Sequence, residues 1–187
     1  VDFGGKIITL DDTPGHHRAN FSANFSYRIH NHNDANTPPV YTLRNRQGNV
    51  VRSLKDNAGL AQKMKDYHAQ PKSFFSFENR TGDELNSWMI TPPGFSEDKE
   101  YPVYVAIYGG PGVNTVEDAW GGANYYWHQM LAQNGYIVVS CDPRGTPKRG
   151  KTFKHSTYKE LGKLETDDFI DFGKHLQGLS YVASDRI

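Results

Sequence analysis

A tyrosine followed by a glycine-rich tetrapeptide is the part of this sequence best suited to chemistry. Tyr108 ends an apolar run and is followed directly by Gly109, Gly110, Pro111 and Gly112. A tyrosine hydroxyl can donate a hydrogen bond to a developing negative charge, and glycines let the backbone lie close to a ligand. A site that stabilises an oxyanion is one interpretation of this pattern. The other, which the pattern alone favours, is a tight strand-to-helix turn in which the tyrosine only packs.

The same glycines do not form a phosphate-binding loop. The segment lacks the G-x-G-x-x-G spacing of dinucleotide sites, and it lacks the G-K-S or G-K-T ending of nucleoside triphosphate sites. The sequence thus gives no reason to expect a nucleotide cofactor.

Several other ionisable residues have structural explanations. Asp142 and Arg144 follow the end of an apolar strand, and we do not expect Asp142 to be catalytic. Glu165, Asp167 and Asp168 lie where a helix is predicted to start, and negative charge is favourable beside that end of the helix dipole. We expect these three to cap the helix, not to form an acid–base pair.

Cysteine and histidine do not suggest a metal centre. Cys141 is the only cysteine, which excludes an internal disulfide and a cysteine-based zinc cluster, and we expect it to be buried in a strand. His30 and His32 lie on the same face of one predicted strand and have the spacing of a metal-binding pair, but no third ligand is evident. We expect His16 and His17 to be solvated in a loop. Packing roles are expected for His128, Trp120 and Trp127, and surface positions for His155 and His175.

The chain contains two segments with different patterns of predicted secondary structure, and these must position the residues named above. Residues 1–56 read as short strands with turns between them, at 6–10, at 21–33 and twice within 40–54 around the hairpin signal "RQGN". Strict alternation within 21–33 places apolar residues such as Phe25 on one face. Four strands in sequence predict an antiparallel meander, which is the repeating unit of a β-propeller.

Residues 57–187 alternate between strands and helices. A helix with Asn57 as its N-cap is predicted over 57–67. Further elements are expected as strands at 73–79, 85–92, 101–109 and 136–142, and as helices at 125–134 and 165–176. This alternation predicts parallel pairing in a doubly wound sheet. The apolar runs at 101–109 and 136–142 predict strands that are covered on both faces.

The composition narrows the function further. The chain has 187 residues and a formal net charge of +0, so charge offers no case for binding nucleic acid or an anionic membrane. No apolar run approaches the length of a membrane span. The chain begins with Val1 rather than methionine, so we expect that the natural N-terminus precedes it and that targeting cannot be read from these residues.

The order of several motifs resembles the prolyl oligopeptidase family of serine peptidases, and most closely its dipeptidyl peptidase IV subfamily. These motifs are "YGGPGV" (108–113), "GYIVVSCDPRG" (135–145), "LGKLETDD" (161–168) and the terminal "DRI" (185–187). In the N-terminal part, "TPPVYTL" (37–43) resembles the last propeller blade of those enzymes. The resemblance covers nearly the whole chain. It implies a partial α/β-hydrolase fold (57–187) preceded by one antiparallel β-propeller blade (1–56).

The resemblance also assigns roles to residues. It implies that Tyr108 donates to the oxyanion hole and that Gly109 and Gly110 form the loop beside it. The family's nucleophile lies in a G-x-S-x-G turn after a strand that begins "RI", and no serine of this chain has that context. The acid and histidine follow the nucleophile in chain order, so no member of the catalytic triad is expected within these residues. No metal and no cofactor are expected.

The resemblance implies a serine exopeptidase that releases N-terminal dipeptides, or tripeptides, after proline or alanine. Its substrates would be peptides that begin Xaa-Pro or Xaa-Ala, and the protein would be a homodimer exported to the bacterial periplasm or cell surface. One alternative is a non-catalytic homologue of the same fold that acts as a binding protein. Another is a related endopeptidase or acyl-aminoacyl peptidase.

Overall fold

The chain divides into two compact units. The computed structural model describes residue 5 and residues 7–187. One unit comprises the chain up to Tyr67 together with residues 118–121, and the other comprises residues 68–117 and 122–187. Helix α1 (Ala58–Asp66) groups with the first unit. Among the described residues, no helix combines the length and the apolar character that crossing a bilayer requires.

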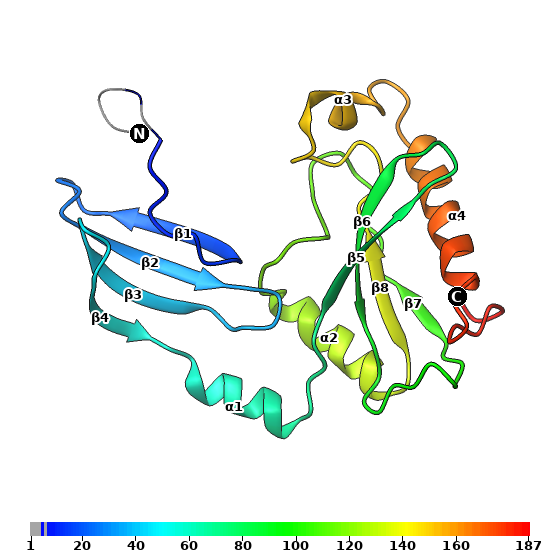
Figure 1. Cartoon of the computed structure of the whole chain (residues 1–187), viewed down its shortest axis with the longest axis horizontal. Coiled ribbons are helices and arrows are strands. Elements are labelled where there is room, and N and C mark those ends of the chain that lie inside the picture. The colour runs from blue at the N-terminus through cyan, green and yellow to red at the C-terminus, as the bar shows by residue number, and fades with distance from the viewer. Residues whose placement is uncertain (1–4, 6) are drawn as a thin grey trace. The chain divides into compact units, whose positions relative to one another are not determined.

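The first unit contains a four-stranded antiparallel sheet (Figure 1). Its strands follow chain order: β1 (His16–Phe21), β2 (Tyr27–Asn33), β3 (Val40–Asn45) and β4 (Val50–Lys55). The predicted hairpin between β3 and β4 is confirmed, and it turns at Gly48, whose φ of 94° suits glycine. The sheet is therefore a meander of the kind that the sequence predicts.

The first two strands lie elsewhere than predicted. Lys6 lies outside the described residues, and residues 7–10 form no strand. The run 21–33 is not one strand, because residues 22–26 form a turn in which Phe25 has a φ of 55°. The side chain of Asn24 closes this turn by accepting hydrogen bonds from Ser22 and Ser26. The alternation of apolar and polar residues continues through this turn, so the sequence pattern did not reveal the hairpin between β1 and β2.

The polar face of β2 is the covered one. Arg28 and His30 are buried, whereas Tyr27 and Ile29 are 49% and 43% exposed. The predicted alternation is therefore present, but within this unit its apolar face is open to solvent. His16 and His17 were expected in a solvated loop; instead they begin β1, and His17 is half-buried.

Residues 10–14 lie over this polar face and contribute an ionised group. Asp11 is paired with Arg44, with 2.6 Å between Oδ2 and Nη1. Hydrogen bonds from Thr13, together with the Arg44 guanidinium, hold the pKa of the Asp11 carboxyl well below its usual range. Burial lowers the pKa of His30. An anionic carboxylate thus lies close to a buried imidazole.

Asn57 does not act as an N-cap. Its backbone is left-handed, with a φ of 53°, and its side chain makes no capping bond to α1. The Asn57 amide instead donates to the Pro39 carbonyl oxygen at 2.6 Å, which ties the start of α1 to the segment before β3.

The second unit is built on a mixed sheet in the order β5-β6-β8-β7. Its strands are β5 (Ser73–Glu78), β6 (Glu84–Ile90), β7 (Val103–Val105) and β8 (Ile137–Cys141). Strands β7 and β8 pair in parallel, as predicted, whereas β5 pairs with β6 and β6 pairs with β8 in the antiparallel direction. The reason is the tight turn between β5 and β6, because a connection that short can join only antiparallel neighbours.

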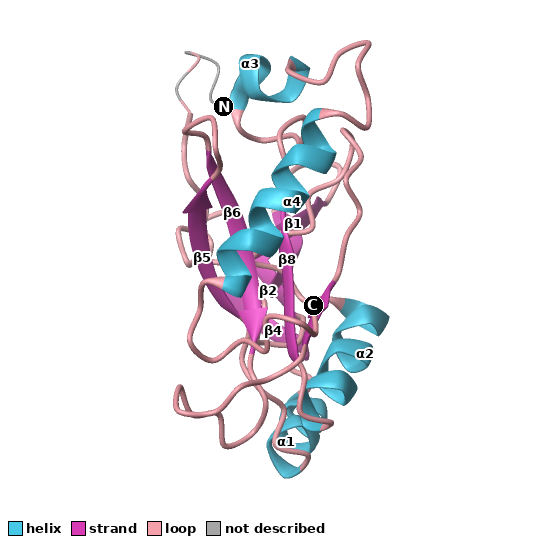
Figure 2. Cartoon of the chain, turned by 90° about the vertical axis from the view of Figure 1, so that its right-hand side faces the viewer, coloured by secondary structure: helices cyan, strands magenta, loops and turns pink. Residues whose placement is uncertain are grey.

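Helices cover both faces of this sheet (Figure 2). Val139 and Cys141 of β8 share a core with Phe172 of α4 (Leu164–Gln177), whereas Val138 packs with Ala132 of α2 (Gly122–Gln133). The helices predicted for these two regions are confirmed, and so is the burial of β8 on both faces. The short α3 (Gly150–His155) was not predicted, and it buries none of its residues.

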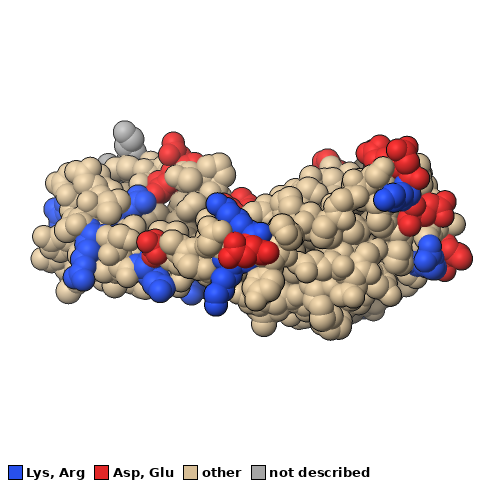
Figure 3. All heavy atoms as spheres, turned by 90° about the horizontal axis from the view of Figure 1, so that it is seen from below, with Lys and Arg blue, Asp and Glu red and all other residues tan. Residues whose placement is uncertain are grey.

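Charged side chains of both signs lie at the surface (Figure 3). On the face drawn in Figure 3, most of the area is uncharged, and acidic side chains accompany basic ones. This distribution matches the balanced composition of 21 basic and 21 acidic residues.

Candidate functional site

Tyr108 lies just beyond the carboxyl end of β7. The strand is shorter than predicted and ends at Val105, although one further ladder bond joins the Ala106 N–H to the Val139 carbonyl oxygen at 2.8 Å. Tyr108 follows two residues later and is 58% exposed. The carboxyl ends of parallel strands are where open α/β sheets place their ligands. The ring is therefore available to a molecule at that edge.

The two glycines after Tyr108 are required by close packing. A Cβ on Gly110 would lie 2.7 Å from Cε1 of the Tyr108 ring. Gly109 has a φ of 74°, and a Cβ there would lie 3.0 Å from Cε2 of Phe169. Since side chains at these positions would displace the ring or strain the backbone, the glycines set the position of Tyr108.

Asp142 anchors the far end of the same loop to the sheet. This buried residue follows β8, and its carboxylate accepts four hydrogen bonds from the loop. Asn114 Nδ2 donates to Oδ2 at 2.8 Å, and the backbone N–H and hydroxyl of Thr115 donate to Oδ1 at 2.7 and 2.9 Å. The Val116 N–H donates to Oδ2 at 3.3 Å. The loop that begins with Tyr108 is thus held at both ends.

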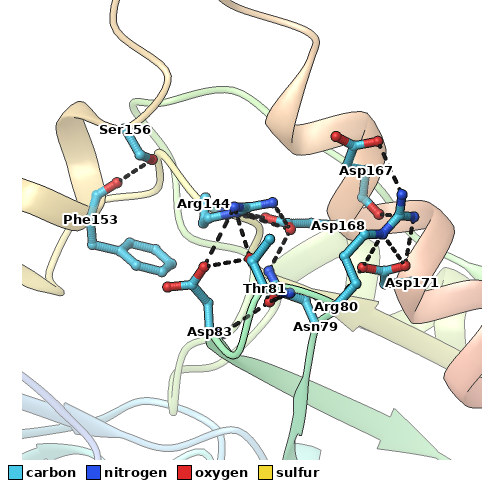
Figure 4. A network of polar contacts seen from close by, with 10 residues as sticks. All are labelled: Asn79, Arg80, Thr81, Asp83, Arg144, Phe153, Ser156, Asp167, Asp168 and Asp171. Atoms are coloured by element: carbon cyan, nitrogen blue, oxygen red, sulfur yellow. Dashed lines mark hydrogen bonds and ion pairs between the residues drawn. The ribbon is translucent and has the colours of Figure 1, made fainter.

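A buried ion pair fixes the neighbouring segment (Figure 4). The side chain of Asp168 is fully buried and that of Arg144 is 10% exposed; Nη2 and Oδ1 are 2.7 Å apart. The Arg144 backbone N–H also donates to Asp168 at 2.7 Å, and Asn79 Nδ2 donates to it at 2.8 Å. Hydrogen bonding to Asp168 raises the pKa of Arg144. Asp168 is therefore an interior anchor, and its predicted role as a helix cap is wrong.

Three other carboxylates on α4 also have structural partners. Asp171 pairs with Arg80 at 2.6 Å, and that hydrogen-bonded contact lowers the Asp171 pKa (Figure 4). Asp167 lies 3.6 Å from Arg80. Glu165 keeps the role expected of it at the helix start, where its Oε2 accepts from the Gly162 N–H at 3.0 Å. None of these pairs has the arrangement of an acid and a base.

The remaining predicted residues have mixed outcomes. Cys141 is buried as predicted, and this burial raises the pKa of its thiol, which disfavours the nucleophilic thiolate. His128 packs against Trp88, with 5.1 Å between ring centroids. Two predictions are wrong: Trp127 is 49% exposed rather than in the core, and His175 stacks on Phe77 rather than lying free at the surface.

Comparison with known proteins shows that both units of the chain resemble parts of the same kind of protein. Residues 123–187 match the sequence model of the prolyl oligopeptidase family. The whole chain superposes on part of the crystal structure of Porphyromonas gingivalis dipeptidyl peptidase 4, with a TM-score of 0.92 and 34% identity. That match covers 100% of this chain and 26% of the other. The resemblance to the prolyl oligopeptidase family that the motifs indicate is thus confirmed.

Two further relatives agree. A probable dipeptidyl peptidase 4 of Emericella nidulans is 33% identical over 182 residues, which cover 95% of this chain and 23% of that protein. A putative dipeptidyl aminopeptidase IV from Bacteroides ovatus superposes with a TM-score of 0.76 at 27% identity, over 92% of this chain and 24% of that one. The chain therefore spans about a quarter of the length of the relatives it matches.

Proposed function

We propose that this chain is part of a serine peptidase that releases dipeptides from the N-termini of peptides through an acyl-enzyme. The observation that carries the proposal is the placement of Tyr108, which is exposed at the carboxyl end of β7 and seated on the Gly110 backbone. The names of the relatives, dipeptidyl peptidases 4, supply the reaction class.

In the proposed reaction, Tyr108 acts on the transition state. A serine attacks the substrate carbonyl, and the carbonyl oxygen becomes an oxyanion. The Tyr108 hydroxyl donates a hydrogen bond to this oxygen. A preorganised donor of this kind is worth about 3 kcal/mol. The serine, its histidine and its acid belong to a part of the protein outside these residues.

The proposal extends to the architecture. Residues 1–56 are proposed as a propeller blade and residues 57–187 as the first part of an α/β-hydrolase domain. In support, the first unit is a four-stranded meander, and the second has a parallel pair flanked by helices. We further propose substrates that begin Xaa-Pro or Xaa-Ala, a homodimer, and export to the periplasm or cell surface.

A non-catalytic binding protein is the second candidate. A protein without catalysis would not need a hydrogen-bond donor at position 108. It would also not need a glycine at position 110 to make room for the Tyr108 ring. Both residues are present and closely packed, which favours the enzyme.

Assay of the full-length protein and of this 187-residue chain on a Gly-Pro p-nitroanilide tests the proposal. We expect saturable hydrolysis and covalent labelling by a fluorophosphonate for the full-length protein, and background turnover for the chain alone. Full-length protein that is folded but neither hydrolyses nor is labelled would support the binding protein instead. Saturable turnover by the chain alone would contradict the assignment of the triad to residues outside it.

Replacing Asp142 by asparagine in the full-length protein is expected to lower kcat about tenfold, with KM little changed. An amide supplies one acceptor oxygen where the carboxylate supplies two, so some of the loop's four donors lose their partner. Because Asp142 would act through Tyr108, the double variant with Tyr108→Phe should lose less than the product of the two single losses. Independent, multiplicative losses would show that Asp142 does not position Tyr108.

A further inference from the structure

Three imidazoles gather on one face of the first sheet. In the register of β1 and β2, His17 lies opposite His32 and Ala19 lies opposite His30. Residues two apart on a strand share a face, so His17, His30 and His32 all point to the same side. The His17 ring centroid is 5.2 Å from that of His30 and 4.6 Å from that of His32. The third member of the group comes from the neighbouring strand, which spacing along β2 alone does not reveal.

Backbone carbonyls orient two of these rings. The Nε2 atom of His17 lies 2.7 Å from the Thr13 carbonyl oxygen, and the Nε2 atom of His32 lies 2.9 Å from that of Pro14. A carbonyl only accepts, so Nε2 carries the hydrogen in each ring and the lone pair of the neutral ring is on Nδ1. Metal-ligating histidines are commonly held by such a bond from the other ring nitrogen.

The ligand atoms come close together around His30. The Nδ1 atom of His17 lies 2.9 Å from Nε2 of His30. Asp11 Oδ2 lies 3.9 Å from Nδ1, the other nitrogen of the His30 ring. With one ligand atom taken from each of Asp11, His17 and His30, the three atoms lie within 4.8 Å of one another. Bonds of about 2.0–2.1 Å at tetrahedral angles separate two nitrogen ligands by about 3.3 Å. The two nitrogens therefore need to part by only a few tenths of an ångström, and the ion takes the place of the hydrogen that His30 Nε2 donates to His17 Nδ1.

A cavity adjoins these atoms. It has a volume of about 180 Å³ and is lined by Asp11, His17 and His30, with Leu10, Ala19 and the two arginines Arg18 and Arg28. Water occupies about 30 Å³ per molecule, so the cavity holds the waters that would complete a coordination shell.

We propose that Asp11, His17 and His30 bind one divalent transition-metal ion of the zinc class, with water in the remaining positions. Two imidazoles and a carboxylate suit Zn²⁺ better than the all-oxygen shells of Ca²⁺ or Mg²⁺. The bound ion links residues 10–14 to β1 and β2 and so holds this segment on the sheet.

The Arg44 guanidinium limits the affinity of this site. It occupies one position on Asp11 Oδ2, and its charge repels a cation nearby. A carboxylate has about four lone-pair positions, so Asp11 accepts from Arg44 and still has one for the ion. The site therefore binds its metal less tightly than a closed structural zinc site does.

Titration of Zn²⁺ into the EDTA-stripped full-length protein, followed by calorimetry, tests the site. We expect His17→Ala, His30→Ala and Asp11→Asn each to weaken binding of one ion by tenfold or more. His16→Ala is the matched control, because His16 is exposed, adjacent in sequence and on the opposite face of β1, and it should leave binding unchanged. Bound Co²⁺ should show visible absorption bands that these three substitutions abolish.

Controls separate loss of the site from loss of the fold. Far-UV circular dichroism checks each variant, and Asp11→Asn, outside the strands, gives a result even where a histidine variant unfolds. Zinc should also slow proteolysis of residues 10–14 in the wild type and not in Asp11→Asn. The proposal is overturned by unchanged binding in folded His17→Ala or Asp11→Asn, or by an equal loss in His16→Ala.

Discussion

Replacing Tyr108 by phenylalanine in the full-length protein is expected to lower kcat by about 10²–10³-fold while KM stays within a few-fold. In the proposed mechanism the hydroxyl donates to the oxygen on which negative charge develops, so its loss should destabilise the transition state and spare the bound substrate. Phenylalanine keeps the ring that rests on Gly110, so the melting temperature should change little. Steady-state kinetics on a Gly-Pro anilide measures both constants.

Tyr104→Phe provides the matched control. Tyr104 lies on β7 itself, four residues before Tyr108, and it too is partly exposed. Removing its hydroxyl should leave kcat unchanged if the effect belongs to the oxyanion site. If Tyr108 only packs, kcat of Tyr108→Phe should remain within a factor of about three of wild type. That result would remove Tyr108 from the proposed mechanism.

The sequence predicted those parts of the fold in which local pattern and tertiary environment agree. The apolar run of β8 predicted burial on both faces, and Val138 and Val139 do pack into different cores. The prediction of a single strand over residues 21–33 failed because the alternation continues through the turn at Asn24, where a side-chain hydrogen bond rather than hydropathy sets the backbone conformation. The direction of β6 depended on the short turn that precedes it, which the helix–strand alternation does not report.

Contacts between distant segments were the part of the site that the sequence did not predict. Tyr108 and its glycines are contiguous, so the motif alone indicated them. The bonds from Thr115 to Asp142 join residues 27 positions apart, and Asp11 approaches His30 from outside the sheet. Each such contact needs the register of two elements, which a single sequence read by itself does not supply. The buried pairing of Asp168 was missed for the same reason, although its position at a helix start had suggested a simpler role.

Asp168→Asn is expected to destabilise the second unit by about 3–5 kcal/mol, because it leaves the Arg144 charge buried without its partner. Arg144 is 10% exposed, and its remaining contacts are the Thr81 hydroxyl at 3.0 Å and Asp83 at 3.5 Å. Neither replaces the several hydrogen bonds that Asp168 accepts. In the full-length protein, the transition that reports on this unit should shift down by about 6–20 °C.

The matched control is Asp167→Asn, one residue earlier on α4. Asp167 is 40% exposed and lies 3.6 Å from Arg80, so its replacement should move the same transition by no more than about 2 °C. A small shift for Asp168→Asn as well would mean that water or Asp83 solvates Arg144 after the change, and that the pair is not an anchor.

Removing the charges of both Arg144 and Asp168 tests whether this ion pair stabilises the fold or is only tolerated in it. A buried pair replaced together by apolar residues of similar volume often costs little, because no charge is left without a partner. The double variant Arg144→Met with Asp168→Leu should therefore be more stable than Asp168→Asn alone. It should still be less stable than wild type, because the Asp168 carboxylate also accepts hydrogen bonds from the Asn79 side chain and the Arg144 backbone N–H. These bonds join the β5–β6 turn and the segment after β8 to α4, and no apolar side chain can accept them.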